Sequence, residues 1–266
     1  MRICTTAAVV SSVVLALAVS TAAHAASAAR YVALGDSYSS GLGAGSYLSS
    51  SGSCDRSTSA YPEQWSDARS PASFVSVACS GATTADVIDS QVSALGASTT
   101  LVSITIGGND AGFSSVMETC VLASTSSCLN AVSTAEAFIT SPGGLPASLD
   151  TTLRTIRADA PNATIVVLGY PDLYDLSKSS TCIGLSTEDR TALNGGADDL
   201  DGALAAAAAR NGDTFADVRP GFAGHEICDP GSWLNSMDIF AISSSYHPNA
   251  SGQELGYLKV FTENAG

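Results

Sequence analysis

The chain has 266 residues, of which 45% are hydrophobic, and it carries a formal net charge of -14 at pH 7. It is too long for a miniprotein held together only by disulfides and too apolar to be disordered, and one α/β domain of about 240 residues fits its length. Its 11 basic residues include only two lysines, so we expect neither nucleic-acid binding nor a polybasic membrane anchor, both of which need a basic face.

Residues 1–25 have the pattern of a secretory signal peptide. Arg2 is followed by a mostly apolar run over residues 7–19, and Ala23-His24-Ala25 offers small residues for cleavage. The run is shorter than the roughly 20 residues that span a membrane, and no later stretch reaches that length. We therefore predict a secreted protein without a stable membrane anchor, with a single domain over residues 26–266 and a mature charge of -15.

Cleavage would remove one cysteine and leave an even number. In an exported protein this predicts three disulfides, worth about 2–4 kcal/mol each. Six cysteines allow 15 connectivities, among which sequential pairing closes the shortest loops, although the sequence alone does not choose. A zinc site would need CxxC or histidine spacing, which is absent. The six cysteines are Cys54, Cys79, Cys120, Cys128, Cys182 and Cys228.

Short apolar, β-branched runs alternate with segments of helical composition along the rest of the chain. Strands are predicted over residues 31–35, 74–78, 101–106, 164–168 and 214–218, helices over 146–159 and 187–210, and long loops over 39–59 and 124–144. This order predicts a mainly parallel sheet with helices on both faces. In such a fold the ligand crevice lies beyond the carboxyl ends of the strands.

Polar blocks follow the first three predicted strands at their carboxyl ends. They are Gly-Asp-Ser-Tyr-Ser-Ser-Gly from residue 35, Cys-Ser-Gly-Ala-Thr from residue 79 and Gly-Gly-Asn-Asp from residue 107. Ser37 is the candidate nucleophile. The N–H groups of Ser37 and Gly81 and the side-chain amide of Asn109 are candidates for an oxyanion hole, which stabilises the charge that forms when an acyl carbonyl is attacked.

A serine nucleophile needs a base, and the chain has three histidines. His24 would leave with the signal peptide. His225 lies near Cys228 and is interpreted as structural. His247 is in a turn-forming segment before the C-terminal helical stretch, from which it can reach Ser37, so it is the predicted base.

The Gly-Asp-Ser block, Gly81, the Gly-Gly-Asn-Asp block and Tyr-His-Pro-Asn at residue 246 together resemble the SGNH (GDSL-type) hydrolase superfamily. The resemblance spans residue 31 to the C-terminus and is closest to secreted bacterial lipases, esterases and phospholipases A1 with three disulfides. It implies that Ser37, Gly81, Asn109 and His247 are the name-giving residues. It also implies a flavodoxin-like three-layer α/β/α sandwich with a five-stranded sheet, sequential disulfides, and no metal or organic cofactor.

One position departs from the pattern of this superfamily. Most members have an aspartate three residues before the histidine, where this chain has Ser244, and no acid lies between Asp238 and His247. The resemblance then implies a dyad in which a main-chain carbonyl orients the imidazole. Ser245 is the first candidate for that carbonyl and Ser244 the second. Without a negative charge beside the ring we expect a histidine pKa lower than in a triad, and activity that rises through neutral pH.

Each motif also has an ordinary structural interpretation. Gly-Asp-Ser is common turn chemistry, Gly81 could serve a tight turn, Asn109 could cap a helix, and His247 could be a surface turn residue. Their joint occurrence at three strand ends favours catalysis instead. The G-x-S-x-G elbow of α/β-hydrolases is absent around Ser37. Asp36 and Asp110 are interpreted as residues that fix their loops.

The predicted function is a secreted serine ester hydrolase that acts on lipid carboxylic esters, as a lipase, esterase or phospholipase A1. The alternatives are a deacetylase of polysaccharides or small esters and, in another class, an inactive lipid- or glycan-binding module. The expected partners are the ester substrate and transient lipid surfaces, and the expected state is a monomer. The apolar residues Leu42, Tyr47, Phe113 and Leu122 suggest an acyl-binding groove, although packing in the core explains them at least as well. Acyl length, head group and regioselectivity depend on loops 39–60, 112–144 and 172–187.

Overall fold

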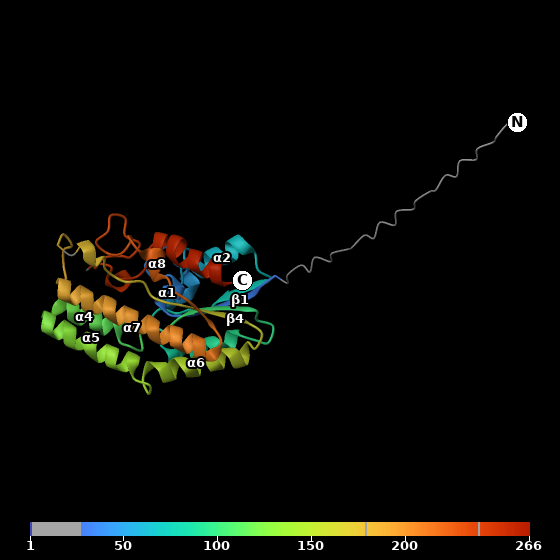
Figure 1. The fold of residues 1–266 in the computed structure, drawn as a ribbon, viewed down its shortest axis with the longest axis horizontal. Helices are drawn as coiled ribbons and strands as arrows, with labels where there is room; N and C mark the ends of the chain where they lie inside the picture. The colour runs from blue at the N-terminus through green and yellow to red at the C-terminus, as the bar shows by residue number, and fades with distance from the viewer. Residues whose placement is uncertain (2–27, 179, 239) are drawn as a thin grey trace.

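The computed structural model describes residues 1, 28–178, 180–238 and 240–266 and shows a sheet between two layers of helices (Figure 1). All neighbouring strands are parallel, in the order β2-β1-β3-β4-β5. This is the doubly wound order in which ligands bind where the connections diverge, between β1 and β3. The strands are β1 Arg30–Gly35, β2 Ser73–Ser76, β3 Leu101–Thr105, β4 Thr164–Leu168 and β5 Thr214–Ala216.

Helices cover both faces of the sheet. In Figure 1, α6 and α7 lie on one side, whereas α2 and the red C-terminal helices lie on the other. The α-helices are α1 Ser37–Ser40, α2 Tyr61–Arg69, α3 Thr84–Asp86, α4 Phe113–Leu122, α5 Thr125–Thr140, α6 Leu145–Asp159, α7 Thr187–Asn211, α8 Arg219–Phe222 and α9 Lys259–Asn264. Short 3₁₀ segments are η1 Ser49–Cys54, η3 Val92–Ala94, η4 Leu176–Lys178 and η5 Ile242–Ser244, and π-helical segments are η2 Val87–Gln91 and η6 Gly252–Leu258. The predicted three-layer α/β/α sandwich is confirmed.

The central strands are buried because helices cover the sheet on both faces. Every residue of β3 is buried, as are all but the first residues of β1 and β4, whereas the edge strands β2 and β5 are partly exposed. Central strands therefore appear in the sequence as nearly continuous apolar runs. All five strands lie where they were predicted, within a few residues at their ends.

The predicted loop over residues 124–144 is wrong, because most of it is α5. Its small polar residues resemble a loop by composition. One face of α5, however, buries Cys128, Val132 and Ile139, and the helix packs against α4 and α7. The spacing of these three residues matches one face of a helix. The apolar periodicity thus indicated a helix, but the prediction followed the high serine and threonine content instead.

The three disulfides pair in sequence order: Cys54–Cys79, Cys120–Cys128 and Cys182–Cys228. The favoured connectivity is thus confirmed. The predicted signal peptide falls, apart from residue 1, outside the described residues, so the boundary at residue 25 stays a prediction. Among the described residues no helix combines the length and the apolar character needed to cross a membrane.

The three disulfides differ in the length of chain that they close, and this predicts their order of importance. In the loop-entropy relation, replacing Cys182 and Cys228 by Ala, a separation of 46 residues, lowers the free energy of unfolding by about 4 kcal/mol. Replacing Cys120 and Cys128, a separation of 8 residues, lowers it by about 2.5 kcal/mol. Urea unfolding of both double variants under non-oxidising, non-reducing conditions measures the difference. The reverse order would show that native contacts, rather than loop closure, dominate.

Candidate active site

Ser37 lies directly after β1, at the first turn of α1. Gly35 ends the strand with φ +120°, and a Cβ there would lie 2.4 Å from the carbonyl oxygen of Thr105 on β3. Only glycine fits this close approach between two neighbouring parallel strands. The next residue, Asp36, caps α1 by accepting a 3.0 Å hydrogen bond from the N–H of Tyr38. This turn places Ser37 at the carboxyl edge of the sheet, as the strand pattern predicted.

Asp36 is fully buried beside Ser37 and anchors the turn. Its carboxyl accepts hydrogen bonds from the hydroxyls of Tyr170 and, at 2.7 Å, Thr105. Burial raises the pKa of Asp36 to about 6, although these hydrogen bonds oppose the shift. All its polar contacts face the scaffold, which agrees with the structural role expected of this residue.

The second block is positioned by the first disulfide. Cys79 is bonded to Cys54, and the N–H of Ser80 donates to the carbonyl of Cys54 at 3.1 Å. Gly81 follows with φ +82°, in the left-handed region that favours glycine, and a Cβ there would meet no atom within 4 Å. Glycine is needed here for backbone conformation, and open space lies in front of it.

Asn109 and Asp110, in the loop after β3, hold the second block in place. The Asn109 amide donates to the carbonyl of Ala82 at 2.9 Å. The Asp110 carboxylate accepts from the N–H of Thr84 at 3.0 Å and from its hydroxyl at 2.5 Å. The loops after β2 and β3 are therefore joined, which brings Asn109 to the same edge of the sheet as Ser37. Asp110 fixes its loop, as expected.

His247 is carried by a loop that is anchored on the scaffold. Its carbonyl accepts from the N–H of Asn235 at 2.9 Å, and the Asn235 side chain donates to the carbonyl of Gly43 at 3.0 Å. Tyr246 adopts φ 65°, unusual for a non-glycine residue, and its carbonyl accepts from the Tyr38 hydroxyl at 2.7 Å. These contacts join the loop to the segment that follows Ser37.

The imidazole of His247 lies between Ser37 and a backbone carbonyl. Its Nε2 is 2.8 Å from Ser37 Oγ, and its Nδ1 is 2.9 Å from the carbonyl oxygen of Ser245. Because a carbonyl only accepts, Nδ1 carries the proton of the neutral ring and Nε2 faces the serine hydroxyl as an acceptor. The carbonyl at Nδ1 is that of Ser245, the first candidate, whereas the carbonyl of Ser244 accepts from the backbone N–H of His247 at 3.3 Å.

Burial determines the charge state of His247. The side chain is 8% exposed, and loss of hydration lowers its pKa to about 4, while the Ser245 carbonyl partly opposes the shift. The expectation of a pKa lower than in a triad agrees with this direction. The expected rise of activity through neutral pH does not, because the imidazole is already neutral well below pH 7.

Two aromatic rings lie near the histidine: Phe113, suggested from the sequence for an acyl-binding groove, and Tyr38, which was given no role. The ring of Tyr38 lies 5.1 Å from that of His247, and Phe113 meets it edge to face at 6.4 Å. Tyr38 is inside the Gly-Asp-Ser block, so its position offered a signal. His225 takes no part in these contacts. Its ring stacks on that of Trp233 with the ring centres 3.8 Å apart, which agrees with a structural role.

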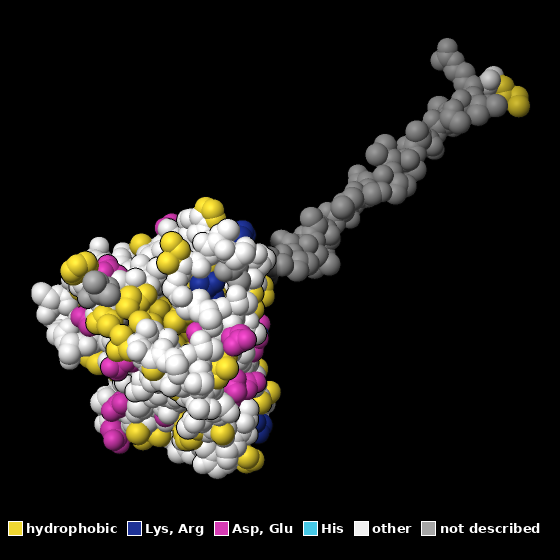
Figure 2. Space-filling view, turned by 90° about the vertical axis from the view of Figure 1, so that its left-hand side faces the viewer, with side chains coloured by type: hydrophobic (Ala, Val, Ile, Leu, Met, Phe, Trp, Pro, Cys, Tyr) yellow, Lys and Arg dark blue, Asp and Glu magenta, His cyan; other side chains and the backbone are white. Residues whose placement is uncertain are grey.

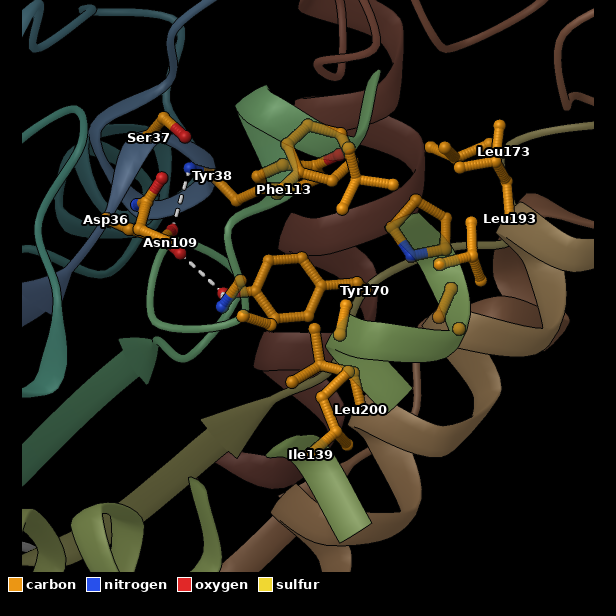
Figure 3. Close-up of a pocket in the computed structure, with 18 residues that line it drawn as sticks. Asp36, Ser37, Tyr38, Asn109, Phe113, Ile139, Tyr170, Leu173, Leu193 and Leu200 are labelled. Carbon is orange, nitrogen blue, oxygen red and sulfur yellow. Dashed lines mark hydrogen bonds between the residues drawn. The ribbon is translucent and has the colours of Figure 1, made fainter. Parts of the chain in front are cut away.

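An apolar cavity opens at Ser37 and extends between helices α4, α5 and α7. It holds about 720 Å³ of space free of protein atoms, including solvent at its mouth. Figure 3 shows Ser37 and Asn109 on one side of it and the leucines of its far wall on the other. Of the four apolar residues suggested by the sequence, Phe113 lines this cavity, but Leu42, Tyr47 and Leu122 do not. The side chains of its apolar wall include Val116, Val132, Ile139, Leu173, Leu193 and Leu200.

Among the described residues, no three or more His, Cys, Asp or Glu side chains gather in a group that could hold a metal ion. The arrangement provides a hydroxyl, a neutral imidazole in contact with it and an apolar cavity beside both.

Comparison with known proteins assigns the chain to a family. The model of the GDSL-like lipase/acylhydrolase family matches residues 33–255. The chain belongs to this family. Lipase 1 of Streptomyces coelicolor is 55% identical over 239 residues, which cover 90% of this chain and 88% of that protein. The predicted membership of the SGNH (GDSL-type) superfamily is thereby confirmed, and with it the class of carboxylic ester hydrolases.

Solved structures of other family members have the same fold. A phospholipase A1 from Streptomyces albidoflavus superposes with a TM-score of 0.86 at 53% identity, covering 90% of this chain and all of that one. An extracellular lipase from Streptomyces rimosus superposes with a TM-score of 0.85 at 49% identity, covering 89% of this chain and all of that one. The GDSL-like fold therefore extends over nearly all the described residues.

The low pKa of His247 predicts a cost in stability at acidic pH. Between the ordinary pKa of 6.5 and about 4 the unfolded chain binds this proton and the folded chain does not, so the free energy of unfolding falls as the pH falls. At pH 4 the loss from this group is about 3 kcal/mol. A His247→Gln variant lacks the group and should lose that much less between pH 7 and pH 4 in urea unfolding. Equal losses in both proteins would contradict the low pKa.

Proposed function

We propose that this GDSL-like family member is a secreted serine ester hydrolase whose catalytic residues are Ser37 and His247. The observation that carries the proposal is the hydrogen-bonded series from Ser37 Oγ through the imidazole to the Ser245 carbonyl, at 2.8 and 2.9 Å. Such a series supplies a nucleophile, a base and a group that orients the base.

The reaction follows from these contacts. His247 Nε2 accepts the hydroxyl proton while Ser37 Oγ bonds to the ester carbonyl carbon. The tetrahedral intermediate then expels the alcohol, whose oxygen takes the proton from Nε2, and an acyl-serine remains. Water attacks the acyl-serine with His247 again as base, which releases the acid and restores the serine hydroxyl.

The N–H groups of Ser37 and Gly81, together with Asn109, form the proposed oxyanion hole. Among the residues that the structure describes, neither N–H donates to a protein acceptor. The Asn109 amide has two hydrogens, and its bond to Ala82 uses one of them. Donors left free at the edge of the reaction site can bind the charge that develops on the carbonyl oxygen.

The substrate that we propose is a lipid carboxylic ester. The cavity beside Ser37 is lined mostly by apolar side chains, which favour a hydrocarbon acyl chain, whereas an acetyl group would leave most of the cavity unfilled. The two superposed Streptomyces structures are of a phospholipase A1 and an extracellular lipase. Together with three disulfides and the signal-like residues 1–25, the second of these also supports secretion.

Replacing the nucleophile tests the proposal directly. Ser37→Ala should lower the turnover of a p-nitrophenyl ester by at least about 10⁴-fold and prevent labelling by a fluorophosphonate, because the acyl-serine cannot form. An unchanged circular dichroism spectrum and melting temperature would show that the fold is intact. Turnover at the wild-type rate would refute the assignment of Ser37.

The pH dependence of kcat/KM tests the base. Imidazole must be neutral to accept the serine proton, and the pKa of His247 is about 4. As the pH is increased, kcat/KM should therefore rise up to about pH 5 and then stay constant through neutral pH. Initial rates on a soluble ester, with samples returned to pH 7 to check for unfolding, measure this profile. An inflection between about pH 6 and 7 would mean that the imidazole titrates near its ordinary value.

A further inference from the structure

Two cavities meet at the active site, and the two catalytic groups face different ones. The acyl cavity described above is lined by Ser37 but not by His247. A second groove lies between α4 and the loop that precedes His247, and it is lined by His247 but not by Ser37. Phe113 lines both and separates them. We call the second space the α4–His247 groove; its lining residues are Phe113, Ser114, Met117, Glu118, Val121, Leu122, Met237, Ile242, Ser243, Ser245, Tyr246 and His247.

The chemistry of ester cleavage assigns the two spaces to the two halves of the substrate. The acyl carbon must lie at Ser37 Oγ, to which it becomes bonded, whereas the oxygen of the departing alcohol must lie at His247 Nε2, from which it takes its proton. We propose that the α4–His247 groove binds the alcohol moiety of the substrate and that this moiety carries a second hydrocarbon chain, as in a diacylglycerolipid. This inference rests on the proposed function of Ser37 and His247.

The lining of the groove supports a hydrocarbon occupant. Met117, Val121 and Met237 contribute apolar surface, and methionine adapts to chains of different shape. The groove continues to Leu122 and Ile242, which are 73% and 69% exposed. A short alcohol would leave this surface uncovered, whereas a long chain that extends from the reaction site would cover it.

Charge also favours a chain over an anionic head group in this groove. Glu118 is the one charged side chain among its described lining residues, and no lysine or arginine is present. A phosphate bound there would meet a carboxylate without a cation to balance it. Figure 2 shows hydrophobic side chains gathered on the face that carries the exposed ends of α4 and of the loop before His247, with acidic side chains around them. The groove is thus suited to the uncharged, hydrocarbon part of the alcohol.

Atoms balance across this partition. The ester C–O bond breaks, the acyl carbon bonds to Ser37 Oγ, and the serine proton passes through His247 to the alcohol, which leaves by way of the α4–His247 groove. Water then adds to the acyl carbon, its proton returns through His247 to Ser37, and the acid leaves from the acyl cavity. Phe113, edge-on to the imidazole, keeps the two chains apart.

Three esters in micelles of a nonionic detergent separate the two halves of the substrate: methyl butyrate, decyl butyrate with a long alcohol, and methyl decanoate with a long acyl chain. The double variant Val121→Gln, Met237→Gln makes the groove polar at nearly constant size. Ala197→Leu, in contrast, narrows the acyl cavity from α7. Leu129→Gln is the matched control, because Leu129 is 36% exposed on α5 and lines neither space.

The quantity compared is the ratio of kcat/KM for each long ester to kcat/KM for methyl butyrate. The double variant should lower this ratio about tenfold for decyl butyrate and leave it unchanged for methyl decanoate. Ala197→Leu should lower kcat/KM for methyl decanoate about tenfold and leave decyl butyrate unchanged. Leu129→Gln should change neither ratio. The partition would be overturned if the double variant lowered the ratio for methyl decanoate instead, lowered both ratios equally or lowered neither. Failure of the proposed function is distinguishable, since Ser37→Ala would then retain turnover of all three esters.

Discussion

The hydrogen bond between His247 Nε2 and Ser37 Oγ joins residues 210 positions apart, and the rest of the site is arranged around it. A surface contact of this kind would compete with water, but both side chains are buried. The scaffold fixes the position of each side chain. Ser37 follows a strand end where only glycine fits, and His247 lies in a loop whose backbone is hydrogen-bonded to that of Asn235. The bond is therefore maintained by the scaffold, so it need not be strong itself.

A neutral carbonyl in place of a carboxylate has a physical consequence. The Ser245 carbonyl can select the tautomer in which Nε2 is free, but it lacks the negative charge that would stabilise an imidazolium in a buried place. Desolvation then dominates and lowers the pKa of His247. The base is therefore in its active form over a wide pH range, while its lower basicity makes proton transfer from the serine more demanding. In the same step, the donors proposed for the oxyanion hole stabilise the negative charge that develops on the carbonyl oxygen of the ester.

A buried series of hydroxyls supports the nucleophile from within the core. Thr105 bridges the Asp36 carboxyl and Ser39, and Ser39 contacts the hydroxyl of Tyr61, which donates to Ser103. Buried polar groups that are all satisfied make an arrangement rigid and specific, because any shift leaves one unpaired. These polar positions on otherwise apolar central strands thus connect the packing of the sheet with the position of Ser37.

The sequence by itself determined which strands the candidate catalytic residues follow, because three apolar runs end at the Gly-Asp-Ser, Ser-Gly and Gly-Gly-Asn-Asp blocks. It also determined the base, because so few histidines are present that His247 follows by elimination. Strands are readable because burial on both faces makes them locally distinct, whereas α5 was missed because its stability comes from packing and a disulfide rather than from composition. Only the tertiary structure decided which carbonyl meets Nδ1, how far burial lowers the histidine pKa, and that Phe113 divides two cavities. Those properties depend on distances and on exclusion of water between segments far apart in the chain, which no local pattern encodes.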